Sequence, residues 1–239
     1  MESQFGLANL WNQGDLITRG VALLLLLMSL ATWAVIVLKA LDIVRFTRHA
    51  RAVQTFWHSD DFAGALTTLG SDPANPFRAL AIEGREATAH HRNTKGQLHE
   101  SLDVSDWVTG SLRNSIDEFT ARLQSGLAIL ASVGSTAPFL GLFGTVWGIY
   151  HALIAIGTSG QSTIDKVAGP VGEALIMTAL GLAVAIPAVL GYNALVRGNK
   201  FILVRMNSFA HDLHAYFVTG ARVSNGDGGS NVRPLKKGA

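Results

Sequence analysis

The chain has 239 residues, of which 49% are hydrophobic and only 15% are charged. In soluble domains of average composition roughly a quarter of the residues are charged, so an ordinary soluble domain is excluded. The chain has no cysteine, which excludes disulfides, thiol nucleophiles and Cys-based zinc sites. The net charge of +2 comes from basic residues beside apolar runs, where they orient membrane helices rather than bind nucleic acid.

Three long stretches, at residues 20–38, 123–164 and 167–196, contain no Asp, Glu, Lys or Arg apart from Glu173. Each stretch is about as long as, or longer than, the ~18 to 20 residues that an α-helix needs to cross ~30 Å of hydrocarbon. The first run is too long for a typical cleaved signal and no cation precedes it before Arg19, which favours a retained anchor. The sequence therefore predicts an all-α membrane protein with three transmembrane helices.

The basic residues are distributed asymmetrically around these spans. Those that follow the first and third spans are Lys39, Arg45, Arg48, Arg51, Arg197, Lys200 and Arg205. Because cytoplasmic flanks of membrane helices are enriched in Lys and Arg, the N-terminus is predicted outside and the C-terminus inside.

This topology divides the chain into eight segments. They are a periplasmic N-terminus (1–17), transmembrane helix 1 (18–39), a cytoplasmic helical region (40–124), transmembrane helix 2 (125–157), a periplasmic loop (158–168), transmembrane helix 3 (169–196), a cytoplasmic C-terminal helix (197–223) and a disordered basic tail (224–239). Apolar residues at helical spacing predict that the membrane helices extend into a cytoplasmic bundle. Breaks are expected at Pro73 to Pro76 and near residues 91–96, but none between Leu112 and the second span.

Small residues mark the faces along which the second and third spans pack. They are Gly141, Gly144 and Gly148 on the second span and Ala174, Gly181 and Ala185 on the third. Gly144 and Gly148 have the GxxxG spacing, which lets helix backbones approach closely. The third-span residues recur at intervals of three or four with Thr178 and form one narrow seam, where a neighbouring helix is expected.

Thr145 and Thr178 lie at comparable depth inside their predicted spans. A hydroxyl relays a proton or binds water at far lower cost than a buried charge. The alternative is that each hydroxyl only bonds back to its own helix, as membrane threonines usually do. The sequence leaves both interpretations open.

Glu173 is the single carboxylate of the third span. A charge deep in a bilayer costs roughly 2.5 to 3.5 kcal/mol on insertion scales, so it is a functional candidate. The alternative is an idle, solvated position at the outer interface. Glu173 and Thr178 are about 140° apart around the helix, so a proton path that uses both must turn around it. A path with a second acid needs a partner chain, because these spans contain no Asp and no other Glu.

No nucleophile, base and oxyanion hole assemble in this sequence, so an enzyme is not predicted. No metal site is predicted either: His211 and His214 are three residues apart but lack an evident third ligand. No cofactor is expected beyond the protons themselves.

Two motifs carry a family resemblance. Residues Ser135–Ile149 and the stretches Gly172–Leu175 and Thr178–Val189 closely resemble the MotA/TolQ/ExbB family of proton-channel subunits. Thr145, Glu173 and Thr178 stand in these motifs, and the resemblance implies that they line the proton pathway. Thr32–Ala34 and the closing stretch Val232–Lys237 resemble the branch that serves TonB-dependent transport more than the Tol-Pal branch.

The resemblance also implies partners and a place in the cell. It implies an inner-membrane homo-oligomer, a pentamer, whose second and third spans surround helices of an ExbD-like protein that supplies the essential Asp. It further implies that proton motive force energises a TonB-like protein for uptake of siderophores and vitamin B12. A Tol-Pal subunit and a non-conducting scaffold for partner helices are the alternatives.

Overall fold

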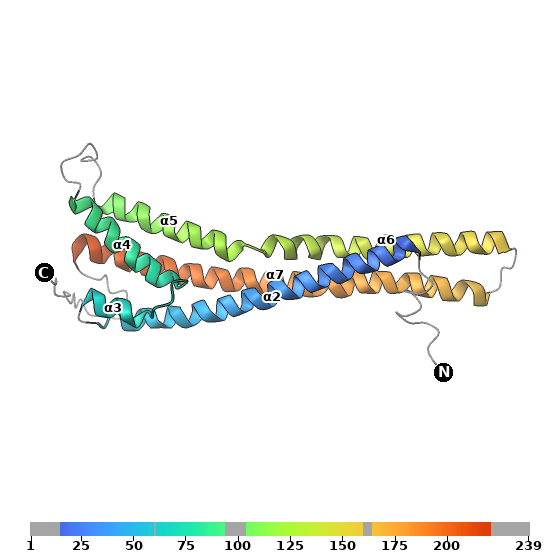
Figure 1. Cartoon of the computed structure of the whole chain (residues 1–239), viewed down its shortest axis with the longest axis horizontal. Helices are drawn as coiled ribbons and strands as arrows, with labels where there is room; N and C mark the ends of the chain where they lie inside the picture. Colours follow the sequence, from blue (N-terminus) through green and yellow to red (C-terminus); the bar gives the residue numbers. More distant parts are fainter. Residues whose placement is uncertain (1–14, 60, 94–103, 160–163, 221–239) are drawn as a thin grey trace, which may run out of the picture. The chain divides into compact units, whose positions relative to one another are not determined.

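The computed structural model describes residues 15–59, 61–93, 104–159 and 164–220, and the side chains of residues 90–93, 155, 159, 164–170 and 173 lie outside this description. The predicted N-terminal segment up to residue 14, part of the periplasmic loop and the basic tail also lie outside it. The described helices are α2 (Leu16–Phe56), α3 (Phe62–Thr68), α4 (Pro76–Asn93), α5 (Val104–Gln124), α6 (Leu127–Ser159) and α7 (Ile164–Thr219) (Figure 1).

Three helical stretches are long and apolar enough to cross a membrane: Leu16–Phe56, Val104–Thr158 and Ala174–Thr219. The described residues form helices and short connections without a strand. The predicted all-α fold class with three membrane-spanning helices is therefore confirmed. The N-out, C-in orientation and the segment boundaries stay predictions.

The chain divides into two compact units. The first, the span unit, comprises Met1–Leu38 and Gly126–Val196, and the second, the charged unit, comprises Lys39–Ser125 and Arg197–Ala239. Most of the charged residues belong to the charged unit, because the desolvation of an ionised side chain in hydrocarbon is costly.

In the span unit, α6 and the first part of α7 run antiparallel. Residues that come later in α6 meet residues that come earlier in α7, since Gly134 lies against Val189 and Gly148 lies against Ala174. The buried cluster between the helices combines small and flexible residues: Val21, Leu25, Val133, Ala137, Met177, Val184, Ala185 and Ala188. α2 joins this packing, because Ile36 lies against Gly191 of α7.

Much of the apolar surface of the span unit is exposed. Phe139 of α6 is 70% exposed and Leu30 of α2 is 60% exposed, and large apolar side chains around them are exposed as well. Exposed apolar surface on this scale marks contact with lipid or with other protein chains. The span unit is thus built to be surrounded by apolar material.

The charged unit has its own core, rich in aromatic side chains. Phe56 of α2, Phe77 of α4 and Phe209 of α7 are each at most 3% exposed. The Phe209 ring meets the Phe56 ring edge-on at 5.3 Å and the Phe77 ring at 5.9 Å between centroids. Edge-to-face pairs of this kind stabilise a core beyond their buried area.

The predicted break near Pro73 to Pro76 separates α3 from α4. Asn75 is 1% exposed and caps α4: its Oδ1 accepts from the amide of Phe77 at 3.0 Å, and its Nδ2 donates to Leu69 O at 2.7 Å. Pro76 occupies the first helical position, where the missing N–H costs nothing. The turn is therefore specified by an N-cap and a proline together.

Asp72, in this turn, makes folding of the charged unit sensitive to acid. The amide of Ala74 donates to its carboxylate, and Arg45 and His49 lie 2.9 and 3.4 Å away, so the pKa of Asp72 lies below its usual value of 3.8. A carboxyl group with a depressed folded pKa contributes stability above the unfolded pKa and loses it as pH falls through the folded pKa.

We therefore expect Asp72→Asn to unfold at a lower temperature than the wild type at neutral pH, and the difference to vanish below the folded pKa of Asp72. Thermal unfolding in detergent across the acidic range measures this. Asp117→Asn, on an exposed face of α5, is the matched control. A deficit of Asp72→Asn that stays constant down to strong acid would contradict this assignment.

The expectation of an uninterrupted helix from Leu112 into the second span is wrong. α5 ends at Gln124 and α6 begins at Leu127, and between them Gly126 has a φ of +83°, a left-handed conformation that glycine adopts readily. The carbonyls at the end of α5 find partners in the charged unit: Lys39 Nζ donates to Arg122 O at 2.9 Å and Asn199 Nδ2 donates to Leu123 O at 2.9 Å. These two side chains satisfy acceptors that a continuous helix would have bonded itself.

Candidate functional site

Glycine residues allow α6 and α7 to approach each other closely. A Cβ placed on Gly141 would lie 2.7 Å from Met177 O, and one placed on Gly181 would lie 2.6 Å from Ala137 O. Gly144 and Gly148 would meet only side chains at their nearest points, Met177 Cε at 3.0 Å and Ala174 Cβ at 2.9 Å. The two helix backbones therefore approach each other most closely at Gly141 and Gly181. The glycines with the GxxxG spacing, Gly144 and Gly148, contact side chains of α7 instead.

The remaining predicted packing residues lie in the same contact. Ala174 and Ala185 are each 4% exposed, and Ala185 belongs to the buried cluster of the span unit. With Gly181 between them, these residues place the small-residue face of α7 against α6. The structure thus brings the small residues of the two spans together.

Thr145 and Thr178 meet across this contact. Thr145 is 7% exposed, and its Oγ1 lies 2.5 Å from Thr178 Oγ1. The same oxygen lies 3.1 Å from Gly141 O in its own helix and 3.1 Å from Ala174 O in α7. The sequence placed both hydroxyls at similar depth, and the fold makes them direct neighbours.

The number of hydroxyl hydrogens limits which hydrogen bonds Thr145 and Thr178 can form at the same time. Thr145 has one hydroxyl hydrogen, and both carbonyls beside it only accept, so the arrangement is best satisfied when Thr145 donates to a carbonyl and Thr178 donates to Thr145. In that arrangement the half-buried Thr178 oxygen keeps lone pairs that accept a hydrogen bond from a further group. The bond back to Gly141 exists, but it is one of three contacts of Thr145.

Glu173 is helical in backbone and lies within α7, one residue before Ala174. Its side chain lies outside the described part of the structure, so its predicted role stays a prediction. In the sequence Glu173 directly precedes Ala174, whose carbonyl oxygen is an acceptor beside the Thr145 hydroxyl.

Two polar groups that the sequence analysis did not assign to the site are buried in the span unit. Thr32 Oγ1 of α2 and Trp147 Nε1 of α6 have no hydrogen-bond partner among the described residues. Nearby on α6, His151 Nε2 lies 3.3 Å from Asp15 Oδ2 and links the start of α2 to α6. Thr32 and Trp147 stand in stretches that carry the family resemblance, but sequence alone did not predict that their polar atoms are buried without a partner, because burial depends on how the helices pack.

Among the described residues, no group of three His, Cys, Asp or Glu side chains is placed to hold a metal ion. The polar chemistry that the structure describes between α6 and α7 consists of hydroxyl and carbonyl oxygens. Such oxygens accept or relay protons without carrying charge themselves.

Comparison with known proteins identifies relatives over most of the chain. Residues 81–208 match the model of the MotA/TolQ/ExbB proton channel family. The chain is 45% identical over 216 residues to the biopolymer transport protein ExbB of Xanthomonas campestris pv. campestris (strain B100), covering 88% of this chain and 85% of that protein. It is 43% identical over 206 residues to the biopolymer transport protein ExbB of Neisseria meningitidis serogroup A, covering 85% and 93%.

A more distant relative is the Tol-Pal system protein TolQ of Pseudomonas aeruginosa, which is 31% identical over 211 residues, covering 87% of this chain and 90% of that protein. The family match includes the whole hydroxyl contact between α6 and α7, since Thr145 and Thr178 both lie within residues 81–208. With its three apolar helices, the chain belongs to the MotA/TolQ/ExbB proton channel family and is a multi-pass protein of the inner membrane.

Proposed function

We propose that this chain is the ExbB-type subunit of an inner-membrane complex that uses proton motive force to energise a TonB-like protein. The complex would drive TonB-dependent uptake of siderophores and vitamin B12 through the outer membrane. The ExbB relatives of Xanthomonas campestris and Neisseria meningitidis are 45% and 43% identical to the chain over most of its length, whereas the TolQ relative is 31% identical. This difference favours ExbB-type transport over the Tol-Pal alternative.

The observation that carries the mechanism is the hydroxyl pair of Thr145 and Thr178, 2.5 Å apart between α6 and α7. With Thr178 donating to Thr145, the free lone pairs of Thr178 accept a hydrogen bond from a protonated acid. For an ionised acid, the Thr178 hydroxyl must turn and donate to the acid, and Thr145 must then donate to Thr178 instead of to a backbone carbonyl. The pair therefore binds the two protonation states of an acid with different free energies.

Such a difference is what a proton-driven motor requires. A protonation change moves an element only if its positions bind the charged and neutral forms unequally. The acid must come in part from a partner, because residues 123–164 contain no carboxylate and residues 167–196 contain only Glu173. An ExbD-like helix with a membrane Asp supplies that group in our proposal, and Glu173 supplies the second acid.

Several copies of the chain are needed to surround such a partner helix. Large apolar side chains are exposed on both α2 and α6, including Leu26, Leu27, Phe143 and Val146. These surfaces support assembly into a homo-oligomer, which we propose to be a pentamer, with lipid covering the remainder.

Proton flux into liposomes tests the proposal. With this chain and an ExbD-like partner reconstituted together under an imposed potential, we expect partner-dependent flux that falls at least tenfold in Glu173→Gln, because a neutral amide cannot titrate. Glu86→Gln, an exposed position of α4, is the matched control and should leave the flux unchanged. Partner-dependent flux that is indifferent to Glu173→Gln would move this residue to a structural role, and the absence of flux would favour the scaffold.

A further inference from the structure

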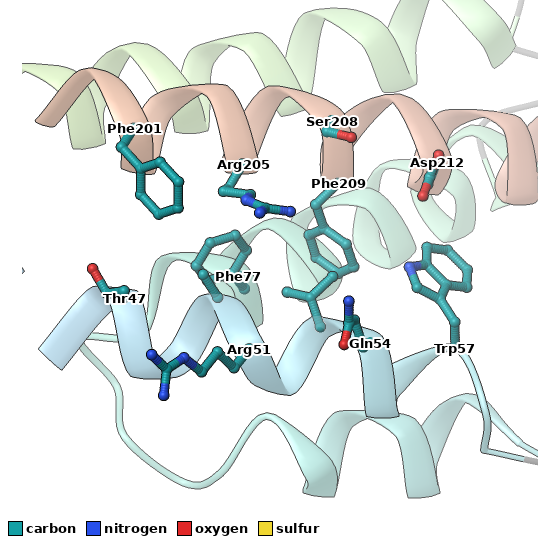
Figure 2. A pocket seen from close by; sticks show the side chains of 12 residues that line it. Thr47, Arg51, Gln54, Trp57, Phe77, Phe201, Arg205, Ser208, Phe209 and Asp212 are labelled. Atoms are coloured by element: carbon teal, nitrogen blue, oxygen red, sulfur yellow. The ribbon is translucent and has the colours of Figure 1, made fainter. Parts of the chain in front are cut away.

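The charged unit contains an open cavity that the proposed proton pathway does not use. The cavity has a volume of about 470 Å³ and lies between α2 and α7, with Phe77 of α4 among its lining residues (Figure 2). Phe77 and Phe209 are 0% and 2% exposed, so they form a fixed apolar wall. A cavity of this size accommodates a small organic molecule.

Two arginines line the cavity, one from each helix. Figure 2 shows Arg205 extending from α7 towards Phe77 and Phe209, while Arg51 lies along α2 with its guanidinium directed away from Arg205. Among the described residues neither arginine forms an ion pair, and the Arg205 guanidinium lies 5.3 Å from the centre of the Phe201 ring. A guanidinium that is not neutralised is well suited to bind phosphate through two parallel hydrogen bonds.

The cavity has a cationic end and an acidic end. Asp212, the one carboxylate among the lining residues, follows Arg205 by seven residues, which is about 10.5 Å along α7. Ser208 lies between them and offers a hydroxyl donor. An anion is therefore favoured beside Arg205, away from the repulsion of Asp212.

We propose that this cavity binds a soluble organic phosphate. In this proposal Arg205 binds the phosphate, Arg51 and Ser208 are the further lining residues that can donate to it, and the apolar or aromatic part of the ligand packs on Phe201, which is 48% exposed. Aromatic rings of the ligand gain stacking energy on this side chain as they do on nucleic-acid-binding surfaces.

The position along α2 favours a soluble ligand over a lipid headgroup. Arg51 lies twelve residues after Lys39, the first cation that follows the first apolar run, and this is about 18 Å along the helix. The polar layer on each side of a bilayer is only about 5 to 8 Å thick. A lipid phosphate is therefore expected closer to Lys39 than to Arg51.

Isothermal titration of the full-length protein in non-ionic detergent tests this inference, with adenosine monophosphate and inorganic phosphate as probes. We expect adenosine monophosphate to bind, and the double variant Arg51→Gln/Arg205→Gln to bind it at least about tenfold more weakly, as loss of charge-assisted hydrogen bonds predicts. The matched double variant Arg48→Gln/Arg197→Gln removes the same charge from exposed positions that do not line the cavity, and should bind normally. Phe201→Ser should weaken binding of adenosine monophosphate but not of inorganic phosphate.

Three results would overturn the proposal. If both double variants bound adenosine monophosphate equally weakly, binding would depend on the overall positive charge of the protein and not on this cavity. Native mass spectrometry that finds phosphatidylglycerol, but not phosphatidylcholine, bound at Arg51 and Arg205, without binding of either soluble probe, would assign the cavity to a lipid. A changed oligomer mass in Arg51→Gln/Arg205→Gln with unchanged phosphate binding would assign it to contact between copies of this chain.

Discussion

Thr178→Val is expected to abolish energised uptake while the protein still folds. Valine keeps the shape of threonine but removes the hydroxyl that lies 2.5 Å from Thr145, and so removes the group that distinguishes a protonated from an ionised acid. The stability cost is about 1 kcal/mol, the typical value of one hydrogen bond. Growth on a chelated iron source, in cells that depend on this chain, measures the loss.

Two variants of Thr145 distinguish loss of the hydroxyl group from loss of side-chain packing. Thr145→Ser retains a hydroxyl beside Ala174 O and should support growth, whereas Thr145→Val should not. Thr136→Val is the matched control, because the exposed Thr136 hydroxyl bonds only back to Ser132 O in its own helix. Normal growth of both valine variants at Thr145 and Thr178 would refute a role of the hydroxyl pair in the motor.

Gly141→Ala is expected to have the largest effect on the span unit. The added Cβ would lie 2.7 Å from Met177 O and 3.1 Å from Gly181 Cα, which are backbone atoms that cannot turn away. α6 and α7 must then separate, at a cost of about 1 to 3 kcal/mol or more, and separation also lengthens the bond between Thr145 and Thr178. Unfolding of the purified protein in detergent measures the first effect, and the growth assay measures the second.

Gly157→Ala provides the control for this experiment. A Cβ at Gly157, in the same helix, would meet no atom within 4 Å, so only the gain in helix propensity of up to about 1 kcal/mol remains. We expect Gly157→Ala to be at least as stable as the wild type. If Gly141→Ala were equally stable, the close backbone contact would not control the packing of these helices.

The break before the second span shows where sequence reasoning was insufficient. Apolar residues recur at helical spacing from Leu112 to Leu123 and lead into the second span, so the sequence predicts a continuous helix there. The structure instead ends α5 at Gln124, because Lys39 and Asn199 supply donors for the carbonyls that the break exposes. These donors come from α2 and α7, 83 and 76 residues away along the chain, and local patterns do not contain them.

The number and location of the apolar spans follow from the sequence by itself, because the cost of placing charge in hydrocarbon depends on composition within about 20 residues. The small-residue faces follow as well, since helical periodicity places Ala174, Gly181 and Ala185 on one side of α7. Only the tertiary structure decided that Thr145 bonds to Thr178 and that Gly141 meets Gly181. Which residues of two antiparallel helices meet depends on their register, and that register is set by close packing over the whole contact rather than by either helix alone.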